Sequence, residues 1–241
     1  MFVLNGQKVW TSYGDKADWM FILTRTDSEV AKQNGITFLL MDMETPGVSV
    51  RPIRLISGSS PFCETFLTDV RVPVKNVVGR VNGGWALAKA LLGHERTMIA
   101  DAFKQRDDAR RLVTLARKHV GEREGRVTDP IVRDRITQVE MDKSCLDLTL
   151  ARSRDGAKAG HKPGAETSIF KYYGTELNQR RRELMMSILA QQALGWEGDG
   201  YAEDQLGVTR DWLRSRGNTI EGGTSEIQLN VIAKRVLGLP D

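Results

Sequence analysis

Cysteine and histidine are scarce in this chain of 241 residues, and neither type is clustered. The two cysteines, Cys63 and Cys145, lie far apart and lack metal-ligand spacing, which excludes a disulfide framework or a zinc site as the basis of the fold. The three histidines are scattered and no His-Glu-x-x-His motif occurs. These absences argue against a metal-dependent hydrolase.

Long apolar runs are also missing, so the sequence predicts no membrane-spanning segment. The first residues lack the basic and apolar regions of a signal peptide, and we expect a cytoplasmic protein. The glycine-rich segments do not match the Rossmann or P-loop patterns, so neither a nicotinamide nor an ATP site is indicated. With 40% hydrophobic and 27% charged residues, the composition is that of a soluble globular protein.

The net charge is small, +4 from 35 basic and 31 acidic residues, and it is spread along the chain. Arginine runs at 110–111 and 180–182 raise nucleic-acid binding as an alternative. Solvated helix faces explain these runs more simply, so a nucleic-acid partner is not expected.

Residues 1–81 have the pattern of an antiparallel β domain. Short segments rich in β-branched and aromatic residues alternate with Gly, Pro, Asp or Asn, which is typical of strands and turns. The predicted strands cover residues 2–10, 19–26, 35–43, 48–56 and 64–73. The sequence therefore predicts a truncated antiparallel β sandwich or barrel.

Residues 82–241 change to helical periodicity. Helices are predicted at 85–119, 131–157, 165–194 and 226–237, with a short one near Asp211. Asp129-Pro130 is a good helix start signal. Short connections favour an up-and-down four-helix bundle, so the fold class is α+β.

The stretch 219–239 contains the most informative local pattern. Gly222 and Gly223 allow a tight turn, Thr224 can cap a helix, and apolar residues then recur at helical spacing. A helix N-terminus presents unpaired N–H groups to which an anion such as phosphate binds. An ordinary capped helix start is the alternative interpretation.

Several phrases occur in an order that resembles the acyl-CoA dehydrogenases, flavoproteins that desaturate acyl-CoA thioesters. They are LNGQKVWTS, ADWMFILTRTD, GITFLLMDMETPGVSVRPI, IEGGTSEIQ and IAKRVLGLP, and the likeness extends over nearly the whole chain. The resemblance implies FAD as cofactor, an acyl-CoA substrate and an electron-transfer flavoprotein as acceptor. It also implies a homo- or hetero-oligomer, either a dimer or a tetramer.

Glu95 is the predicted catalytic base. It lies in LLGHERTMIA with apolar residues one turn before and after it, so burial could raise its pKa, although a Glu–Arg pair on a wet helix face fits the residues as well. Most relatives carry the base just before the Gly-Thr of the C-terminal signature, where this chain has Gly222. A smaller set, similar to isovaleryl-CoA and long-chain dehydrogenases, has a Glu-Arg dipeptide on the long helix. The resemblance thus favours Glu95, with Arg96 beside it and Glu221 in reserve.

The resemblance also assigns cofactor contacts. It places a Trp-Thr-Ser turn beside the flavin ring, a glutamine and a glycine near the nucleotide half across a subunit boundary, and the C-terminal signature at the pyrophosphate and ribose. The predicted residues are Trp10, Thr11, Ser12, Gln192, Gly195, Gly222, Gly223, Thr224 and Glu226, with Trp196 as a further candidate. The residues alone favour a core aromatic for Trp10, and the Gln192 region fits a glycine-terminated helix and turn as well.

Two departures from the family pattern affect the expected function. Relatives usually carry an R-x-x-F-G motif between the first two bundle helices, and its arginine reaches the flavin diphosphate of a neighbouring subunit. Here that region reads GEREGRVTDP, so either Arg123 or Arg126 substitutes for this arginine or the contact is absent. Full-length relatives begin with a helical domain of roughly a hundred residues, which this chain lacks. The alternative function is therefore a non-catalytic or incomplete subunit that needs a partner chain for that domain. No residue indicates the acyl specificity.

Overall fold

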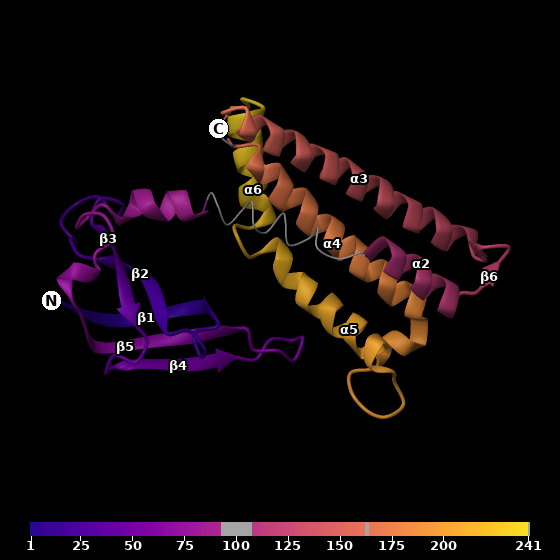
Figure 1. Cartoon of the computed structure of the whole chain (residues 1–241), viewed down its shortest axis with the longest axis horizontal. Coiled ribbons are helices and arrows are strands. Elements are labelled where there is room, and N and C mark those ends of the chain that lie inside the picture. The colour runs from indigo at the N-terminus through magenta and orange to yellow at the C-terminus, as the bar shows by residue number, and fades with distance from the viewer. Residues whose placement is uncertain (93–107, 162–163, 241) are drawn as a thin grey trace. The chain divides into compact units, whose positions relative to one another are not determined.

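The structure is a computed structural model of the 241-residue chain, and it describes residues 1–92, 108–161 and 164–240. The chain divides into two compact units, residues 1–94 and 95–241 (Figure 1). The first unit contains the strands of the predicted β domain and the second contains the long helices. The predicted domain boundary at residues 81/82 stays a prediction, because residues 93–107 lie outside the described part.

The first unit contains two antiparallel sheets. Its strands are β1 (Phe2–Ser12), β2 (Trp19–Arg25), β3 (Ile36–Asp42), β4 (Val48–Ile53) and β5 (Phe62–Val72). Strand β5 lies between β1 and β4, whereas β2 and β3 pair with each other in a separate sheet. All five strands coincide with the predicted segments to within a few residues. The expected antiparallel β architecture is thereby confirmed.

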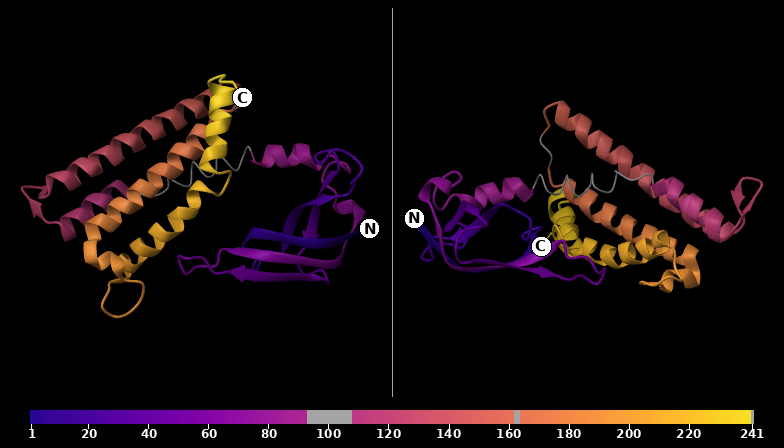
Figure 2. Two further views of the ribbon diagram at one scale, coloured as in Figure 1. Left: turned by 180° about the vertical axis from the view of Figure 1, so that it is seen from behind. Right: turned by 60° about the horizontal axis from the view of Figure 1, so that its bottom comes forward.

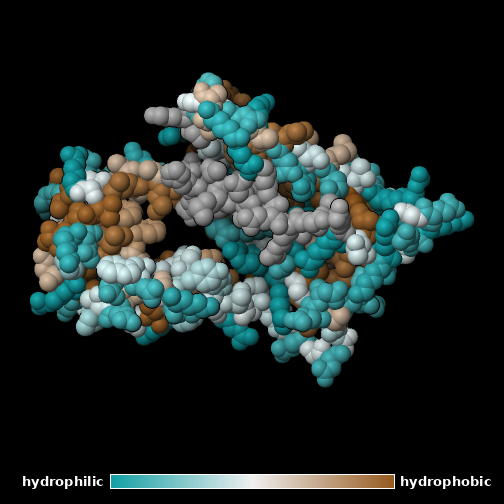
Figure 3. Space-filling model, viewed as in Figure 1, coloured by the Kyte–Doolittle hydropathy of each residue, from teal (hydrophilic) through white to brown (hydrophobic). Residues whose placement is uncertain are grey.

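Alternation along the strands builds the core of this unit. In β2 and β3, Ile22, Leu39 and Met41 are almost completely buried, while Trp19 and Phe21 point outward and are about half exposed. The buried side chains pack against members of the other sheet; the core consists of Leu4, Ile22, Leu39, Met41, Leu67, Val70 and Val72. Figure 3 shows apolar surface gathered on this unit.

A short connection leads from β5 into the first helical residues. The 3-10 turn η1 (Val74–Asn76) follows Pro73, and residues 84–92 are helical. Gly84 starts this helix against β3, where an added Cβ would lie 2.6 Å from the Phe38 backbone nitrogen. Only glycine permits so close an approach of helix and strand.

The second unit is a helical bundle. Its helices are α2 (Asp108–His119), α3 (Pro130–Lys158), α4 (Thr167–Leu189), α5 (Glu203–Ser215) and α6 (Ser225–Val231), with shorter turns η2 (Ala190–Leu194), η3 (Arg216–Thr219) and η4 (Ile232–Val236). Helix α4 contacts each of the other four helices (Figures 1 and 2). The Asp129 carboxylate caps α3 by accepting hydrogen bonds from the Ile131 and Val132 amides, at 2.7 and 3.1 Å. The predicted start signal and the predicted bundle are confirmed.

Helix α4 has two different buried faces. Phe170, Leu177 and Leu184, spaced by seven residues, belong to the apolar core shared with α2 and α3. The opposite set is polar but equally buried or half-buried and meets α5, η3 and α6. It comprises Ser168, Lys171, Thr175, Asn178, Gln179 and Arg182.

Three details differ from the predictions. The helix expected at 165–194 ends at Leu189, because Ala190 adopts a φ of 50° and the chain continues as 3-10 turn η2. The short helix expected near Asp211 is the 13-residue α5. The charged link after α2 forms a small hairpin of β6 (Glu122–Arg123) and β7 (Arg126–Val127). None of the helices in the described residues is long and apolar enough to cross a membrane.

Candidate functional site

The turn predicted to face the flavin ring is an exposed irregularity at the end of β1. The pairing of β1 with β5 shifts register between Lys8 and Thr11, and Trp10 has a φ of 64°. Trp10 is 59% exposed and touches the Phe62 ring edge-on, with centroids 6.1 Å apart. The alternative of a core tryptophan is therefore wrong. Since a bulge redirects side chains, this turn presents an indole face on the surface of the β unit.

Thr11 and Ser12 follow within the same irregular turn. The Thr65 hydroxyl donates to the Thr11 hydroxyl at 3.1 Å, whereas Ser12 is exposed. Tyr13 has a φ of 51°, so Thr11 and Ser12 lie between two non-glycine residues in the left-handed region. Such conformations cost about 1–3 kcal/mol each and cluster at functional sites. The hydroxyl of Ser12 is available to a ligand.

In the helical unit, the glycine segment turns back on the helix that it starts. Gly222 and Gly223 have φ values of 65° and 92°, and the Gln228 side-chain amide donates to the Gly222 carbonyl at 3.0 Å. A Cβ on Gly223 would lie 2.6 Å from the same Gln228 nitrogen. Thr224 caps α6 through a 3.3 Å bond from the Ile227 amide to its hydroxyl. The positive φ therefore favours glycine at both positions, and at Gly223 a side chain would also displace Gln228.

Glu226 lies in the first turn of α6 with an exposed carboxylate. Hydrogen bonding from its own backbone amide, then from Thr224, holds the pKa of this carboxyl below its usual range. The group is thus an anion close to the glycine turn. A carboxylate there repels phosphate but can accept a hydrogen bond from a hydroxyl group.

Glu221, the reserve base, has both carboxylate oxygens engaged. Arg214 Nη2 is 2.7 Å from Oε2, and Asn218 Nδ2 donates to Oε1 at 2.5 Å. Each carboxylate oxygen therefore has one partner, and these contacts give Glu221 a role in holding the loop. The assignment of the base to Glu95 stays a prediction.

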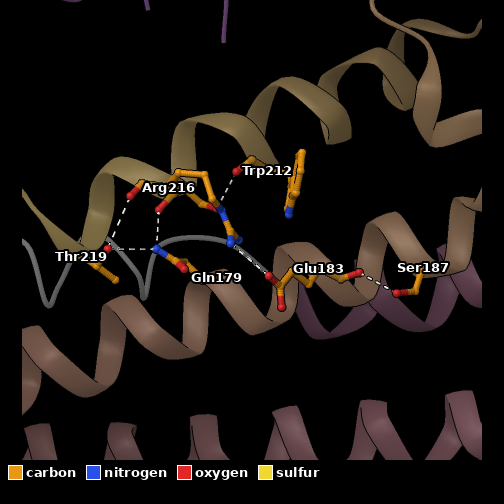
Figure 4. A network of polar contacts seen from close by, with 7 residues as sticks. Gln179, Glu183, Ser187, Trp212, Arg216 and Thr219 are labelled. Carbon is orange, nitrogen blue, oxygen red and sulfur yellow. Dashed lines mark hydrogen bonds and ion pairs between the residues drawn. The ribbon is translucent and has the colours of Figure 1, made fainter. Parts of the chain in front are cut away.

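A network on α4 anchors the segment that precedes the glycines (Figure 4). Gln179 donates to the Ser215 carbonyl at 3.0 Å and to the Thr219 hydroxyl at 3.3 Å. Arg216 pairs with Glu183 at 3.0 Å and its guanidinium lies 5.3 Å from the Trp212 ring centroid. The start of the glycine segment is therefore fixed to α4 by several polar contacts.

The second predicted cofactor element lies around the end of α4. Gln205 donates to Gln192 Oε1 at 2.6 Å and accepts from the Ala202 amide at 3.1 Å. A Cβ on Gly195 would come within 2.4 Å of the Tyr201 ring, so glycine is required at this position. Trp196 is half-buried beneath the Arg210 guanidinium, which lies 5.4 Å from its ring centroid.

The two elements of the bundle lie at opposite ends of α5. Gln192 is tied to Gln205 near the start of this helix and Glu221 to Arg214 near its end. At 1.5 Å per residue the nine intervening steps separate them by about 14 Å. The two elements are therefore separate within the bundle, and the expectation that the Gln192 element serves a cofactor across a subunit boundary stays a prediction.

For the remaining predicted residues the structure gives little or no information on a site. Glu95 and Arg96 lie outside the described residues. Arg123 and Arg126 are both exposed on the β6–β7 hairpin, where Arg123 pairs with its neighbour Glu124 at 3.9 Å. The sequence reasoning missed Gln228, which supports the glycine turn; its spacing of four residues from Thr224 was the available signal.

The fold and these turns define a class: a β domain followed by a helical bundle, as found in FAD-dependent dehydrogenases that act on acyl-CoA. Residues 1–70 match the profile "Acyl-CoA dehydrogenase, middle domain" and residues 82–237 match "Acyl-CoA dehydrogenase, C-terminal domain". The chain belongs to the acyl-CoA dehydrogenase family, as the sequence resemblance predicted.

Known proteins support this membership over the full length of the chain. It is 38% identical over 239 residues to acyl-CoA dehydrogenase FadE34 of Mycobacterium tuberculosis, covering 99% of this chain and 31% of that protein. It is 34% identical to acyl-CoA dehydrogenase IpdE1 of Mycolicibacterium smegmatis, covering 99% of this chain and 58% of that one. The chain therefore spans about a third to three fifths of these relatives.

Solved structures share the fold. The Tcur3481–Tcur3483 steroid acyl-CoA dehydrogenase superposes with a TM-score of 0.88 at 28% identity, covering 99% of this chain and 61% of that chain. The ChsE4–ChsE5 complex from Mycobacterium tuberculosis gives a TM-score of 0.79 at 29% identity, with 99% and 62% covered. Each of these two structures contains two different gene products.

Proposed function

We propose that this chain forms part of an FAD-dependent acyl-CoA dehydrogenase that introduces an α,β double bond into an acyl-CoA thioester. Family membership over both domains is the observation that carries the proposal. Two turns with left-handed backbone support it. The turn at Trp10 presents an exposed indole, and the turn at Gly222 and Gly223 precedes the capped helix α6. A flat aromatic suits a flavin ring, and a glycine turn at a helix start suits a diphosphate.

The residues fit FAD in a defined way. Trp10, Thr11 and Ser12 would contact the ring, and Gly222, Gly223 and Thr224 would present backbone amides to the diphosphate. Glu226 would accept a ribose hydroxyl, because its anionic carboxylate is exposed beside the turn. Gln192 and Gly195 would contact the nucleotide half of a cofactor held mainly by another subunit. Bound FAD supplies the acceptor for the hydride that leaves the β-carbon.

The proton chemistry is assigned to Glu95. Its carboxylate would remove the α-proton of the thioester, and Arg96 would position it. A separate electron-transfer flavoprotein is the proposed electron acceptor, and the cytoplasm is the proposed location.

A second candidate is a subunit that is incomplete by itself. Two of the structures that it resembles are complexes of two gene products. A hetero-oligomer in which a partner contributes further walls of the site is therefore our proposal for the assembly.

An anaerobic absorbance titration tests the proposal. The purified protein, reconstituted with FAD, is mixed with a panel of acyl-CoA thioesters, and we expect one class to bleach the flavin bands. Glu95→Gln should abolish bleaching while FAD binding persists, and Glu221→Gln, the matched control, should still bleach. Bleaching by Glu95→Gln at the wild-type rate would contradict the assignment of the base. A wild-type protein that binds FAD without bleaching by any thioester would favour the second candidate.

A further inference from the structure

Lys171 is a fully buried lysine in the polar face of α4. Its side chain is 0% exposed, and within the described part of the chain the ammonium has no hydrogen-bond partner. A buried charge without a partner is unfavourable, because water no longer solvates it. Such a group calls for a charged or polar ligand that is not supplied by its own neighbours.

The environment of Lys171 locates this ammonium near the glycine segment. Helix α4 packs against α6, and Glu176, five residues after Lys171, accepts a 3.0 Å hydrogen bond from the Ser225 hydroxyl. The carboxylates that act on the Lys171 charge belong to Glu221, Glu176 and Glu226, in that order. Glu221 and Glu226 flank the Gly222–Thr224 turn in sequence, and Glu176 holds Ser225 directly after it.

Two further buried polar atoms near this turn also lack partners among the described residues. Gln228 donates its amide to the Gly222 carbonyl, but its Oε1 atom has no partner and its side chain is 0% exposed. The Ser168 hydroxyl, one turn before Lys171 on the same face, is equally buried and unpartnered. Polar groups in such an interior are normally satisfied by protein, water or a ligand.

The charges around the turn explain why a cation is needed there. Glu176, Glu221 and Glu226 would together repel a diphosphate, and Arg214 is committed to Glu221 at 2.7 Å. Burial lowers the pKa of Lys171, while the three carboxylates oppose that effect and favour the ammonium. In the low dielectric of the interior, this charge acts over a longer range than it would at the surface.

We propose that Lys171 is a further cofactor-positioning residue, whose buried ammonium provides the positive charge beneath the Gly222–Thr224 turn for the diphosphate of the dinucleotide bound over it. This role rests on the proposed FAD site and adds to it a residue that does not belong to the C-terminal signature. The ammonium acts through the turn and takes no part in the chemistry of the substrate.

The test compares FAD affinity in the wild type, Lys171→Met and Lys158→Met, measured by quenching of flavin fluorescence. Lys158 is the matched control, because it carries the same charge on an exposed site, 80% accessible beside Asp155. We expect Lys171→Met to weaken FAD binding about tenfold or more, and Lys158→Met to leave it unchanged. If Lys171→Met does not fold, Lys171→Gln replaces it in the same comparison.

Competition by ADP and adenosine separates a charge effect from a general loss of structure. Lys171→Met should weaken the binding of ADP about as much as the binding of FAD and leave the affinity for adenosine unchanged. The variant should also unfold at no lower urea concentration than the wild type. Equal FAD affinity in Lys171→Met and wild type would overturn the inference. Absence of FAD binding by the wild type itself would overturn the proposed function, an outcome that is visible before any variant is made.

Discussion

The two buried faces of helix α4 differ in the kind of contact that they make. One face contributes Phe170, Leu177 and Leu184 to an apolar core shared with α2 and α3. The other places Asn178 against η3 and Arg182 against α5, where they form a hydrogen bond and an ion pair, and it also buries Lys171. Apolar burial is not directional, whereas hydrogen bonds fix geometry. The apolar face therefore stabilises the bundle, whereas the polar face positions the glycine segment.

The largest effect is expected from Leu184→Ala on the apolar face. Leu184 is 1% exposed, and truncating such a leucine costs about 2–5 kcal/mol of the free energy of unfolding. Urea denaturation followed by circular dichroism at 222 nm measures this loss. Under native conditions FAD affinity should match the wild type, in contrast to Lys171→Met. A variant with normal stability and weakened FAD binding would break the distinction between the faces.

Gly195→Ala should destabilise by about 1–3 kcal/mol through overpacking, because the new methyl group would meet the Tyr201 ring. Gly207→Ala is the matched control in α5, where the added Cβ finds open space. That control should stabilise the helix by up to about 1 kcal/mol. Thermal unfolding of both variants checks the opposite signs, and a harmless Gly195→Ala would refute the close contact.

Asn178→Ala tests the polar face by removing two hydrogen bonds, one to Asn218 and one from Arg181. Asn178 donates to Asn218 at 2.8 Å, and Asn218 in turn holds Glu221. We expect a loss of about 1–2 kcal/mol, since a buried acceptor is left unpaired. A double-mutant cycle with Asn218→Ala should give a coupling energy of about 0.5 kcal/mol or more. Additive effects would mean that the two residues act independently.

Thr224→Ala should cost about 1 kcal/mol by removing the N-cap of α6. The bond from the Ile227 amide to the Thr224 hydroxyl is lost, while the glycine turn keeps its sequence. Thr224→Ser retains a capping oxygen and should restore most of the stability. If serine were no better than alanine in urea denaturation, the capping role would be contradicted.

The smallest effect concerns the pH dependence contributed by Glu226. Its pKa is held below the usual range in the folded protein, so its stabilising contribution is present above the unfolded pKa and is lost as pH falls through the folded pKa. Glu226→Gln lacks this contribution at every pH. The stability difference between wild type and variant should therefore shrink on acidification, and a difference that grows would contradict the assigned direction.

Much of the fold could be predicted from local patterns. Alternation marked the strands, and Asp129-Pro130 marked the start of α3, because these signals depend on neighbouring residues only. The end of α4 could not be predicted, since Ala190 leaves the helix with a positive φ that no residue type there indicates. The β6–β7 hairpin was missed because its strands have two residues each and no apolar alternation.

The site was predictable where it is contiguous and unpredictable where it depends on packing. Gly222, Gly223 and Thr224 could be recognised together as a turn and cap. The contacts of Glu221 with Arg214 and Asn218 depend on packing, because Asn218 is held by Asn178. Ser225, directly after the turn, is held by Glu176. Both partners lie on α4, some forty to fifty positions earlier in the chain. The exposure of Trp10 also follows from a register shift between two strands that are distant in sequence.

Hydrogen–deuterium exchange with and without FAD tests the site assignment most directly. Bound FAD should slow exchange in peptides that cover residues 222–226 and residues 10–12, while peptides from the middle of α3 should not change. Flavin fluorescence quenching recorded on the same sample verifies that FAD is bound. Binding of FAD without protection at the glycine segment would contradict the assignment of the cofactor site to this turn.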